Sequence, residues 1–338
     1  MEQQNTSKLL RDQLALTLSE YFRSVASVRE GEEPPFLKKW RSVIDLYDIV
    51  MGNKPRIIGV YGTPKMGKST LLNSLVQEDI LPRGIKPVTG SVINMERQQN
   101  ACEYTVTSYR ADESGKETLS RVFGHPDVEK VHQYLEREAG QSNPSDRVEV
   151  KGTFPHALGL FRDRYKLRDT PGAISRAALS ENLSRDSQRA IQSMNEVCVP
   201  IFCVSCESLQ EKNHVQYFKD FFADRICICV ITKCDDLTEE ERRELRNEFL
   251  NTYGILDEDT PIVFTAKENT SDPFVMPSCC HELDTVIEKI LSEENVAGKI
   301  RSSCNTLLGL SAEGVDIGWV VPRSILDNMS YLLANFTK

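Results

Sequence analysis

Gly62-Thr63-Pro64-Lys65-Met66-Gly67-Lys68-Ser69 is the stretch that decides the fold, because it has the spacing G-x-x-x-x-G-K-S of a phosphate-binding P-loop. It follows the apolar run 57–61 and precedes the run 69–76, in which leucines recur at helical spacing. The motif requires this order of strand, loop and helix. We expect phosphate to bind along the loop and at the adjoining Thr70, with Lys68 reaching the β- and γ-phosphates and Ser69 reaching a Mg²⁺ ion.

A second segment has the pattern of a strand whose last residues contact the same bound phosphate and Mg²⁺. The run 167–172 ends in Asp169-Thr170-Pro171-Gly172. After a P-loop, an aspartate in this place holds Mg²⁺ through water. The N–H group of Gly172 is then placed to meet the γ-phosphate. Asp169 is therefore a metal candidate and Gly172 a phosphate candidate.

Two further segments indicate which base is bound. The run 228–235 ends in Thr232-Lys233-Cys234-Asp235, and Thr265-Ala266-Lys267 follows a third apolar run. The Asp235 carboxylate accepts hydrogen bonds from N1–H and the 2-amino group of guanine, a donor pair that adenine lacks. The Lys233 stem covers the face of the base, and the segment 265–267 meets the guanine carbonyl. The order of these segments after the P-loop predicts a guanine nucleotide, GTP or GDP.

The bulk properties are those of a globular protein with an acidic balance. The chain has 338 residues, of which 40% are hydrophobic and 27% charged, and its net charge is −9. This charge argues against a broad basic surface, so no nucleic-acid partner is expected. No apolar stretch approaches the length of a membrane-spanning helix, and residues 1–8 lack the apolar core of a signal peptide.

The ten cysteines indicate a reducing compartment. Several lie within apolar runs, where cysteine acts as a small hydrophobic residue. Cys203 and Cys206 have the spacing of a zinc pair, but no second pair is suitably placed, so we expect thiols rather than a metal site. A cytoplasmic location is the resulting expectation, with attachment to a membrane only through a partner.

Three regions are expected along the chain. Residues 1–52 contain two helical runs, over 9–22 and 36–50. Strand and helix runs then alternate over 53–294, which is typical of a mostly parallel α/β sheet flanked by helices. This alternation is interrupted by two β runs, 90–97 and 104–109, a charged helix at 127–137 and a short strand at 148–152. Residues 295–338 contain further helical runs, over 296–310 and 325–336.

The sequences of several loops resemble those of a known family. The runs 67–75 and 79–89, and the run 148–155 shortly before the Asp169 motif, are similar to the GTPase domain of dynamin-like proteins, most closely the bacterial ones. The resemblance covers about residues 35–294. It implies an enlarged P-loop GTPase domain, with a helical neck formed by the segments before and after it. It also implies that Thr89 is the switch threonine, which closes on Mg²⁺ and the γ-phosphate.

Two positions in the P-loop depart from this family. Dynamins use a polar pair to place water and a monovalent cation, and here the pair is Pro64 and Lys65. Proline has no side-chain donor, so the usual contact to water is missing. Lys65 takes the place in which the related guanylate-binding proteins carry an internal arginine finger. Its positive charge is therefore a catalytic candidate beside Lys68 and Thr89, and the alternative is an ordinary lysine in solvent.

The resemblance leaves several functions open. The first is hydrolysis of GTP to GDP and phosphate, with loops that switch between the two states. The second is a poorly hydrolysing module that pairs with a full-length dynamin-like protein. A translation-type or ribosome-assembly GTPase is a third reading, and the acidic balance counts against it. The segment 295–338 is too short for a dynamin stalk, so we expect nucleotide-dependent homodimers or such pairs rather than collars on membranes.

Overall fold

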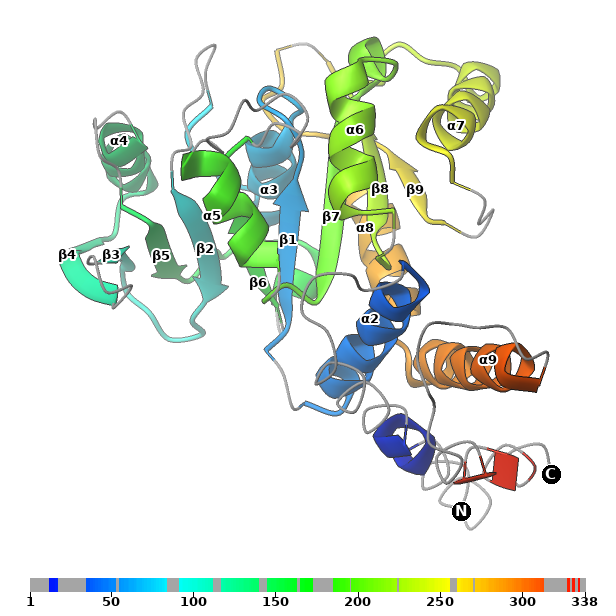
Figure 1. The fold of residues 1–338 in the computed structure, drawn as a ribbon. Helices are drawn as coiled ribbons and strands as arrows, with labels where there is room; N and C mark the ends of the chain where they lie inside the picture. Colours follow the sequence, from blue (N-terminus) through cyan, green and yellow to red (C-terminus); the bar gives the residue numbers. More distant parts are fainter. Residues whose placement is uncertain are drawn as a thin grey trace. The chain divides into compact units, whose positions relative to one another are not determined.

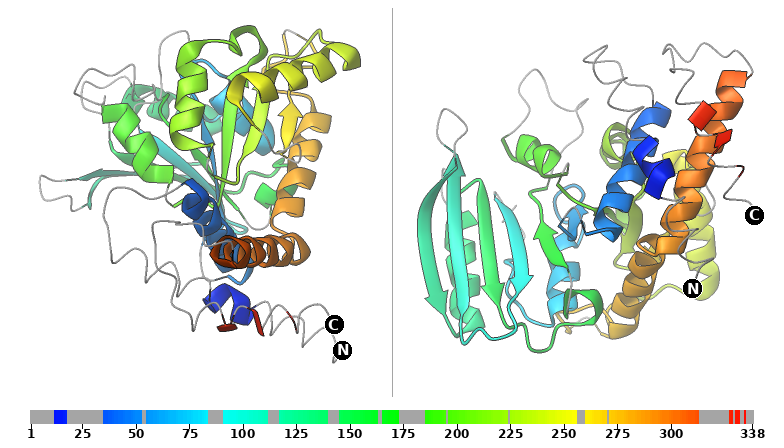
Figure 2. Two further views of the ribbon diagram at one scale, coloured as in Figure 1. Left: turned by 45° about the vertical axis from the view of Figure 1, so that its right-hand side comes forward. Right: turned by 90° about the horizontal axis from the view of Figure 1, so that it is seen from below.

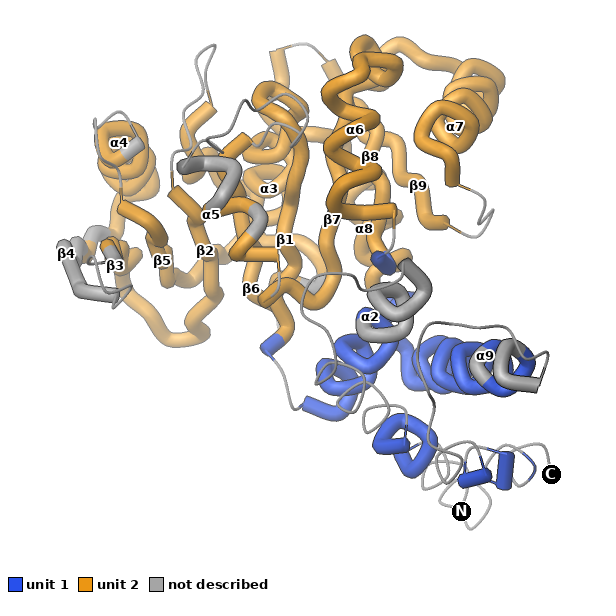
Figure 3. The backbone as a smooth tube through the Cα atoms, viewed as in Figure 1, with its two compact units in different colours: residues 1–55, 224–226, 288–338 blue, residues 56–223, 227–287 orange. Residues whose placement is uncertain are grey.

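The computed structural model describes fifteen stretches of the chain, which lie in two compact units. They are residues 12–17, 35–52, 55–83, 91–111, 117–139, 145–162, 165–172, 185–194, 196–223, 225–255, 260–269, 271–312, 327–328, 330–331 and 334. One unit consists of residues 1–55, 224–226 and 288–338, and the other of residues 56–223 and 227–287 (Figure 3). The P-loop and the three motifs that follow it all belong to the second unit.

The second unit is built on one sheet, which has nine strands in the described residues (Figure 1). The strands are β1 (Ile57–Tyr61), β2 (Val92–Arg97), β3 (Tyr104–Ala111), β4 (Glu117–His125), β5 (Arg147–Gly152), β6 (Lys166–Asp169), β7 (Val199–Ser205), β8 (Ile228–Thr232) and β9 (Ile262–Phe264). Their order is β4-β3-β5-β2-β6-β1-β7-β8-β9. The five strands from β6 to β9 are parallel, β2 is antiparallel to β6, and β3 is antiparallel to both its neighbours.

The parallel part of the sheet determines where the motifs meet. All five residues of β1 and of β8, and all seven of β7, are buried, as expected for strands that are covered on both faces. These strands run in the same direction, so their C-terminal ends open on one edge of the sheet. That edge is formed by Tyr61, Asp169, Ser205, Thr232 and Phe264, and the P-loop begins directly after the first of them.

Helices cover the sheet on its two faces. They are α3 (Lys68–Val76), α4 (Val128–Ala139), α5 (Arg185–Met194), α6 (Lys212–Phe221), α7 (Glu239–Tyr253) and α8 (Pro277–Ile290), with short 3-10 turns η1 (Gly159–Arg162) and η3 (Cys206–Ser208). Helices α5 and α6 lie in front of the sheet in Figure 1 and α3 and α8 behind it, as the view from below also shows (Figure 2). Under α6 and α7, Phe202 of β7 packs edge-on against Phe218 at 5.1 Å and against Tyr253 at 5.8 Å.

The first unit contains two long helices that lie side by side, α2 (Pro35–Val50) and α9 (Glu293–Ala312). Each has a buried apolar stripe at helical spacing: Val43, Leu46 and Ile49 on α2, and Val296, Ile300 and Cys304 on α9. Residues 12–17 are also helical, and the Thr17 hydroxyl accepts a 3.0 Å hydrogen bond from Asn328. The neck bundle and its boundaries at residues 52 and 295 remain a proposal.

The expected helix 36–50 and the expected strands 90–97 and 104–109 are found as α2, β2 and β3. Strand β4 was not expected, because its residues Glu117–His125 have no continuous apolar run and it pairs only with β3 at the sheet edge. Most of the expected helices 9–22 and 325–336 lies outside the described residues. In the part that the structure describes, no helix has both the length and the apolar character needed to cross a bilayer.

Replacing Leu46 by aspartate should loosen α9 as well as α2. Leu46 is 2% exposed, and an unpaired carboxylate in its place costs several kcal/mol or forces the helices apart. We expect a lower melting temperature and faster amide hydrogen exchange over residues 296–306. Asn305→Ala, at an exposed position of α9, is the matched control. Unchanged exchange in α9 would contradict the pairing of the two segments.

Candidate functional site

The P-loop backbone follows a path that excludes larger residues at its first position. Gly62 has φ +146°, and a Cβ built on it would lie 2.4 Å from the carbonyl oxygen of Cys203 in β7. No other residue type fits this close approach of loop and strand. Lys65 has φ +68° at the exposed top of the loop, and Gly67 precedes the first residue of α3. The loop therefore has the tight turn that phosphate binding requires.

Lys68 is the charged centre of the loop. Its side chain is 7% exposed, and its ammonium donates hydrogen bonds to the carbonyl oxygens of Gly62 (3.0 Å) and Thr63 (2.9 Å). Burial lowers the pKa of Lys68, and the neighbouring Asp169 carboxylate opposes this shift. An ammonium has three N–H groups, and these two carbonyls accept from two of them. The third can be donated to an anion held by the loop.

Ser69 and Asp169 supply a pair of oxygen ligands next to this lysine. The Ser69 hydroxyl donates a 2.7 Å hydrogen bond to Asp169, which is fully buried at the end of β6. A hydroxyl and a carboxylate side by side are the donors that Mg²⁺ prefers, and the adjoining loop can supply the nucleotide phosphates. The residues present thus fit a magnesium ion shared with a nucleotide.

The segment after β6 lies against the P-loop. Thr170 donates a 2.7 Å hydrogen bond to the carbonyl oxygen of Val60 in β1. A Cβ built on Gly172 would come within 2.7 Å of the backbone nitrogen and of Cγ of Pro64. Glycine is therefore needed at residue 172 for the segment to lie so near the loop.

The two segments predicted to bind the base are adjacent and joined to the P-loop. Thr232 donates a 3.1 Å hydrogen bond to the carbonyl oxygen of Met66. Cys234 N–H donates to the carbonyl oxygen of Thr265 at 3.0 Å, and the backbone N–H of Lys267 donates to the Asp235 carboxylate. The Asp235 side chain is exposed at the sheet edge, where a ligand can reach it.

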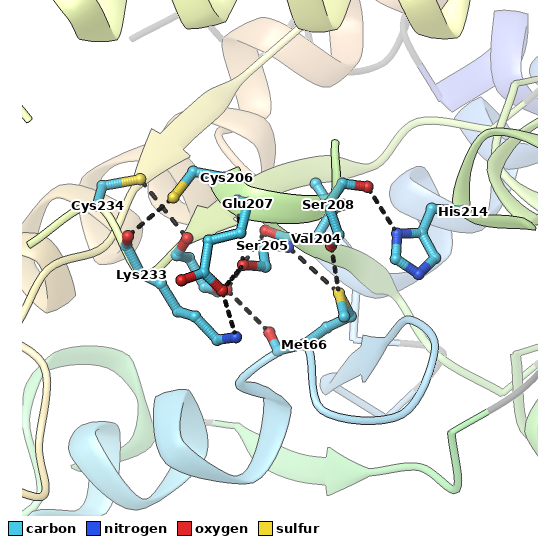
Figure 4. Close-up of polar contacts among 10 residues, drawn as sticks. Met66, Val204, Ser205, Cys206, Glu207, Ser208, His214, Lys233 and Cys234 are labelled. Carbon is cyan, nitrogen blue, oxygen red and sulfur yellow. Dashed lines mark hydrogen bonds and ion pairs between the residues drawn. The ribbon is translucent and has the colours of Figure 1, made fainter. Parts of the chain in front are cut away.

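Lys233 is oriented by residues that follow β7 (Figure 4). Its backbone has φ +60°, and its ammonium donates to Glu207 Oε2 at 3.0 Å. The Cys206 thiol donates to the Lys233 carbonyl oxygen at 2.9 Å. Pairing with Lys233 lowers the pKa of the Glu207 carboxyl. Both side chains of the pair are exposed, so the pair contributes about 0–1 kcal/mol to stability, and its role is to position the lysine.

A pocket of about 440 Å³ lies along the outer side of the P-loop. Its walls are residues 63–66 of the loop, Lys233, and residues between β7 and the first turns of α6. On the α6 side, His214 is buried and donates from Nδ1 to the Ser208 carbonyl oxygen at 3.0 Å. Its Nε2 lies 3.4 Å from Glu211 Oε2. Lys65 therefore lines a hollow that also contains acidic groups.

Arg168 fixes the strand that carries Asp169. It is 2% exposed and donates to Asn94 (2.7 Å), to the Ser193 carbonyl oxygen at the end of α5 (2.8 Å) and to Glu196 (2.8 Å). These bonds join β6 to β2 and to the segment between α5 and β7. One side chain thus connects the start of the Asp169 segment with the helix that follows it.

The structure brings together most of the residues predicted from sequence. Residues 62–70, Asp169 and Gly172 form one end of the site, and Thr232, Lys233, Asp235 and residues 265–267 form the other. Thr89 lies outside the described residues. The sequence reasoning missed Arg168 and Glu207. A charged residue inside the buried strand β6 was a usable signal for Arg168, whereas no sequence signal marks Glu207.

Comparisons with known proteins identify the family of the chain and proteins with a similar fold. Residues 58–249 match the model of a family described as the dynamin family. Solved structures with a similar fold include bacterial dynamins, described as an oligomerised pair that provides a mechanism for the long-range sensing and tethering of membranes. No curated protein matches the chain.

The likeness to these structures concerns the fold. The first is 13% identical, has a TM-score of 0.52, and covers 91% of this chain and 49% of its own. The second is 13% identical, has a TM-score of 0.47, and covers 98% of this chain and 58% of its own. The chain thus spans about half the length of these two structures. Because the family model covers more than half of the sequence, the chain belongs to the dynamin family.

Proposed function

We propose that this chain binds GTP with Mg²⁺, hydrolyses it to GDP and phosphate, and changes its association with the nucleotide state. The observation that carries the proposal is that the predicted phosphate-binding residues and the predicted base-binding residues lie in one connected site. At one end, Lys68 lies beside the Ser69–Asp169 pair. At the other, Asp235 lies next to the 265–267 loop and is linked to the P-loop through Thr232 and Met66.

The chain's own residues would act mainly by position and charge. Lys68 would bridge the β- and γ-phosphates with the N–H group not given to Gly62 and Thr63. Ser69 and Asp169 would hold Mg²⁺, which neutralises charge on the phosphate oxygens. Thr89 and Gly172 would close over the γ-phosphate, and the resemblance to dynamins supports the role of Thr89.

A second function is supported by the contact of Pro64 with Gly172. Proline offers no side-chain donor to water, and the segment after β6 lies directly against it. Such a loop suits slow hydrolysis, with the GTP-bound chain acting as a partner for another dynamin-like protein. Turnover measured alone and with increasing protein concentration separates the two. A rate that rises steeply with concentration supports an enzyme that is completed by self-association.

Guanine selectivity is the direct test of the base site. Asp235→Asn should weaken GTP binding about 10- to 100-fold, because charge-assisted hydrogen bonds worth about 1.5–3 kcal/mol are lost. The variant should gain affinity for xanthosine triphosphate, which offers the complementary group. Titration with labelled GTP, ATP and xanthosine triphosphate measures this. Asp236→Asn, the exposed neighbouring acid, is the control. Equal affinity of the unaltered chain for GTP and ATP would refute the assignment.

Lys68→Met should abolish tight nucleotide binding while leaving the fold intact. Methionine keeps the length of the buried stem and removes the charge, so packing near Gly62 and Thr63 is preserved. We expect GTP affinity to fall about 100-fold or more, since charge-assisted hydrogen bonds to two phosphates are lost. Binding of a fluorescent GTP analogue measures the affinity, and the circular dichroism melting curve measures the stability of the fold. A variant that binds like the unaltered chain would remove Lys68 from the site.

Lys65 is proposed to stabilise charge that builds up between the β- and γ-phosphates in the transition state. Lys65→Ala should then lower kcat about tenfold or more and change GTP affinity less than about threefold. Turnover should be equal in potassium and sodium, because the lysine replaces the cation. Lys212→Ala, an exposed lysine at the start of α6, is the control. An unchanged kcat at high protein concentration would make Lys65 an ordinary surface lysine.

A further inference from the structure

Two thiols face each other where the base-binding loop leaves the sheet. Strands β7 and β8 are parallel neighbours in register, with Ser205 opposite Thr232. Cys206 follows the first and Cys234 lies two residues after the second. Figure 4 shows their sulfur atoms turned toward each other, and the Cys206 thiol donates to the Lys233 carbonyl oxygen at 2.9 Å. The Cys234 thiol also points at the carbonyl oxygen of Ile231, at 3.4 Å.

We infer that Cys206 and Cys234 form a dithiol site that a hydroperoxide converts into a disulfide, closing the base-binding loop onto the end of β7. A disulfide needs Cα atoms about 4.4–6.8 Å apart. Cys206 and Cys234 follow the ends of two strands that are paired side by side, and paired strands lie about 4.8 Å apart. The two sulfur atoms point toward each other, so rotation of the two side chains is the movement that bond formation needs.

This pair differs from the other cysteines that the structure describes. Cys206 is half-buried, so a small oxidant can reach it, and Cys234 is buried directly behind it. Cys227 and Cys229 are near neighbours in the sequence, but both are buried. Cys102 is exposed, and no contact to a second thiol is seen there among the described residues. An accessible thiol with a resolving thiol beside it is the arrangement that favours a reversible disulfide.

The reaction balances with a hydroperoxide as the oxidant. The Cys206 thiolate attacks the outer peroxide oxygen, the O–O bond breaks, an alcohol or water leaves, and a sulfenic acid forms. Cys234 sulfur then attacks the Cys206 sulfur, the S–S bond forms, and water leaves with the Cys234 proton. Two electrons pass from the sulfur atoms to the peroxide. The products are one disulfide, one alcohol or water, and one further water.

The site should react slowly at neutral pH and faster at alkaline pH. Burial raises the pKa of Cys206 and raises that of Cys234 to about 12. Four charged groups face the two thiols from neighbouring elements: Glu207, Lys233, Asp235 and Arg242. The thiolate is the reactive form, so the rate should rise up to about tenfold per pH unit below the thiol pKa.

The disulfide should hold the base-binding loop in place. Oxidation removes the thiol hydrogen that Cys206 donates to the Lys233 carbonyl oxygen and replaces it with a covalent tie. Lys233 and Asp235 stand on either side of Cys234, so the tie restrains both. If the chain binds guanine nucleotide as proposed above, nucleotide release needs this loop to open, and release should be several-fold slower in the oxidised protein.

Peptide mapping of the full chain tests the site without any nucleotide. The protein is treated with hydrogen peroxide at pH 8.5 and digested without reduction. A peptide pair linked through Cys206 and Cys234 is expected, which a thiol reductant separates. Cys206→Ser and Cys234→Ser should each prevent the link, and Cys102→Ser should not. Absence of the linked pair in the folded protein, or a link through other cysteines in its place, overturns the proposal.

Release of a fluorescent GDP tests the consequence. The oxidised chain should release it several-fold more slowly, the reductant should restore the rate, and Cys234→Ser should not respond to peroxide. A linked pair with an unchanged release rate would overturn the restraint on the loop. A chain that forms the link but binds no guanine nucleotide would refute the proposed function and leave the dithiol site standing, so the two failures are distinguishable.

Discussion

The buried ammonium of Lys68 is the constraint that the surrounding strands must satisfy. A charge removed from water is costly unless hydrogen bonds and an opposite charge compensate it. Here the carbonyl oxygens of Gly62 and Thr63 accept from it, and the Asp169 carboxylate lies near it. These groups come from the P-loop and from β6, and β1 and β6 are parallel neighbours that end at the same edge. The topology of the sheet thus brings to this lysine the groups that compensate its burial.

Two polar clusters extend from this centre, and burial makes them unequal. Arg168 is buried with three hydrogen-bonded partners, and leaving a buried polar group without its partner costs about 1–3 kcal/mol. The Lys233–Glu207 pair is exposed and contributes about 0–1 kcal/mol. Arg168 thus makes the strand before Asp169 rigid, whereas the base-binding loop can change its partners at little cost. The phosphate end of the site is therefore held more firmly than the base end, where the Lys233–Glu207 pair is exposed.

Those parts of the site in which one short, continuous segment supplies the binding groups can be predicted from the local sequence. The P-loop, Asp169-Thr170-Pro171-Gly172 and Thr232-Lys233-Cys234-Asp235 are each continuous, so their spacing alone indicates the nucleotide. Contacts between segments are different. Glu207 reaches Lys233 across 26 residues, and Arg168 reaches Asn94 across 74. Nothing in the local pattern marks these partners, because they follow from strand order, which pairs β7 with β8 and β6 with β2.

The same reasoning explains why β4 was missed and α2 was found. Helix α2 has buried residues every three positions along one segment, so its period is visible in the sequence. Strand β4 pairs with β3 alone at the sheet edge, and its sequence has no continuous apolar run. Its existence depends on β3, which itself joins the sheet through β5 rather than through its sequence neighbour β2. An edge strand of this kind is specified by its partner more than by its own residues.

Pro64 lies close to Gly172, in a place where the resemblance to dynamins leads us to expect a polar residue. This difference changes how the P-loop can interact with the segment after β6. In a loop with a polar side chain at this position, the two segments can communicate through hydrogen bonds and water. Here a ring with no donor faces a glycine so closely that a Cβ at residue 172 would clash with it, so the constraint is steric. Steric contacts change abruptly with distance, whereas hydrogen bonds weaken gradually. A side chain at residue 172 would therefore displace Pro64, which is followed by Lys65, whose backbone lies in the left-handed region.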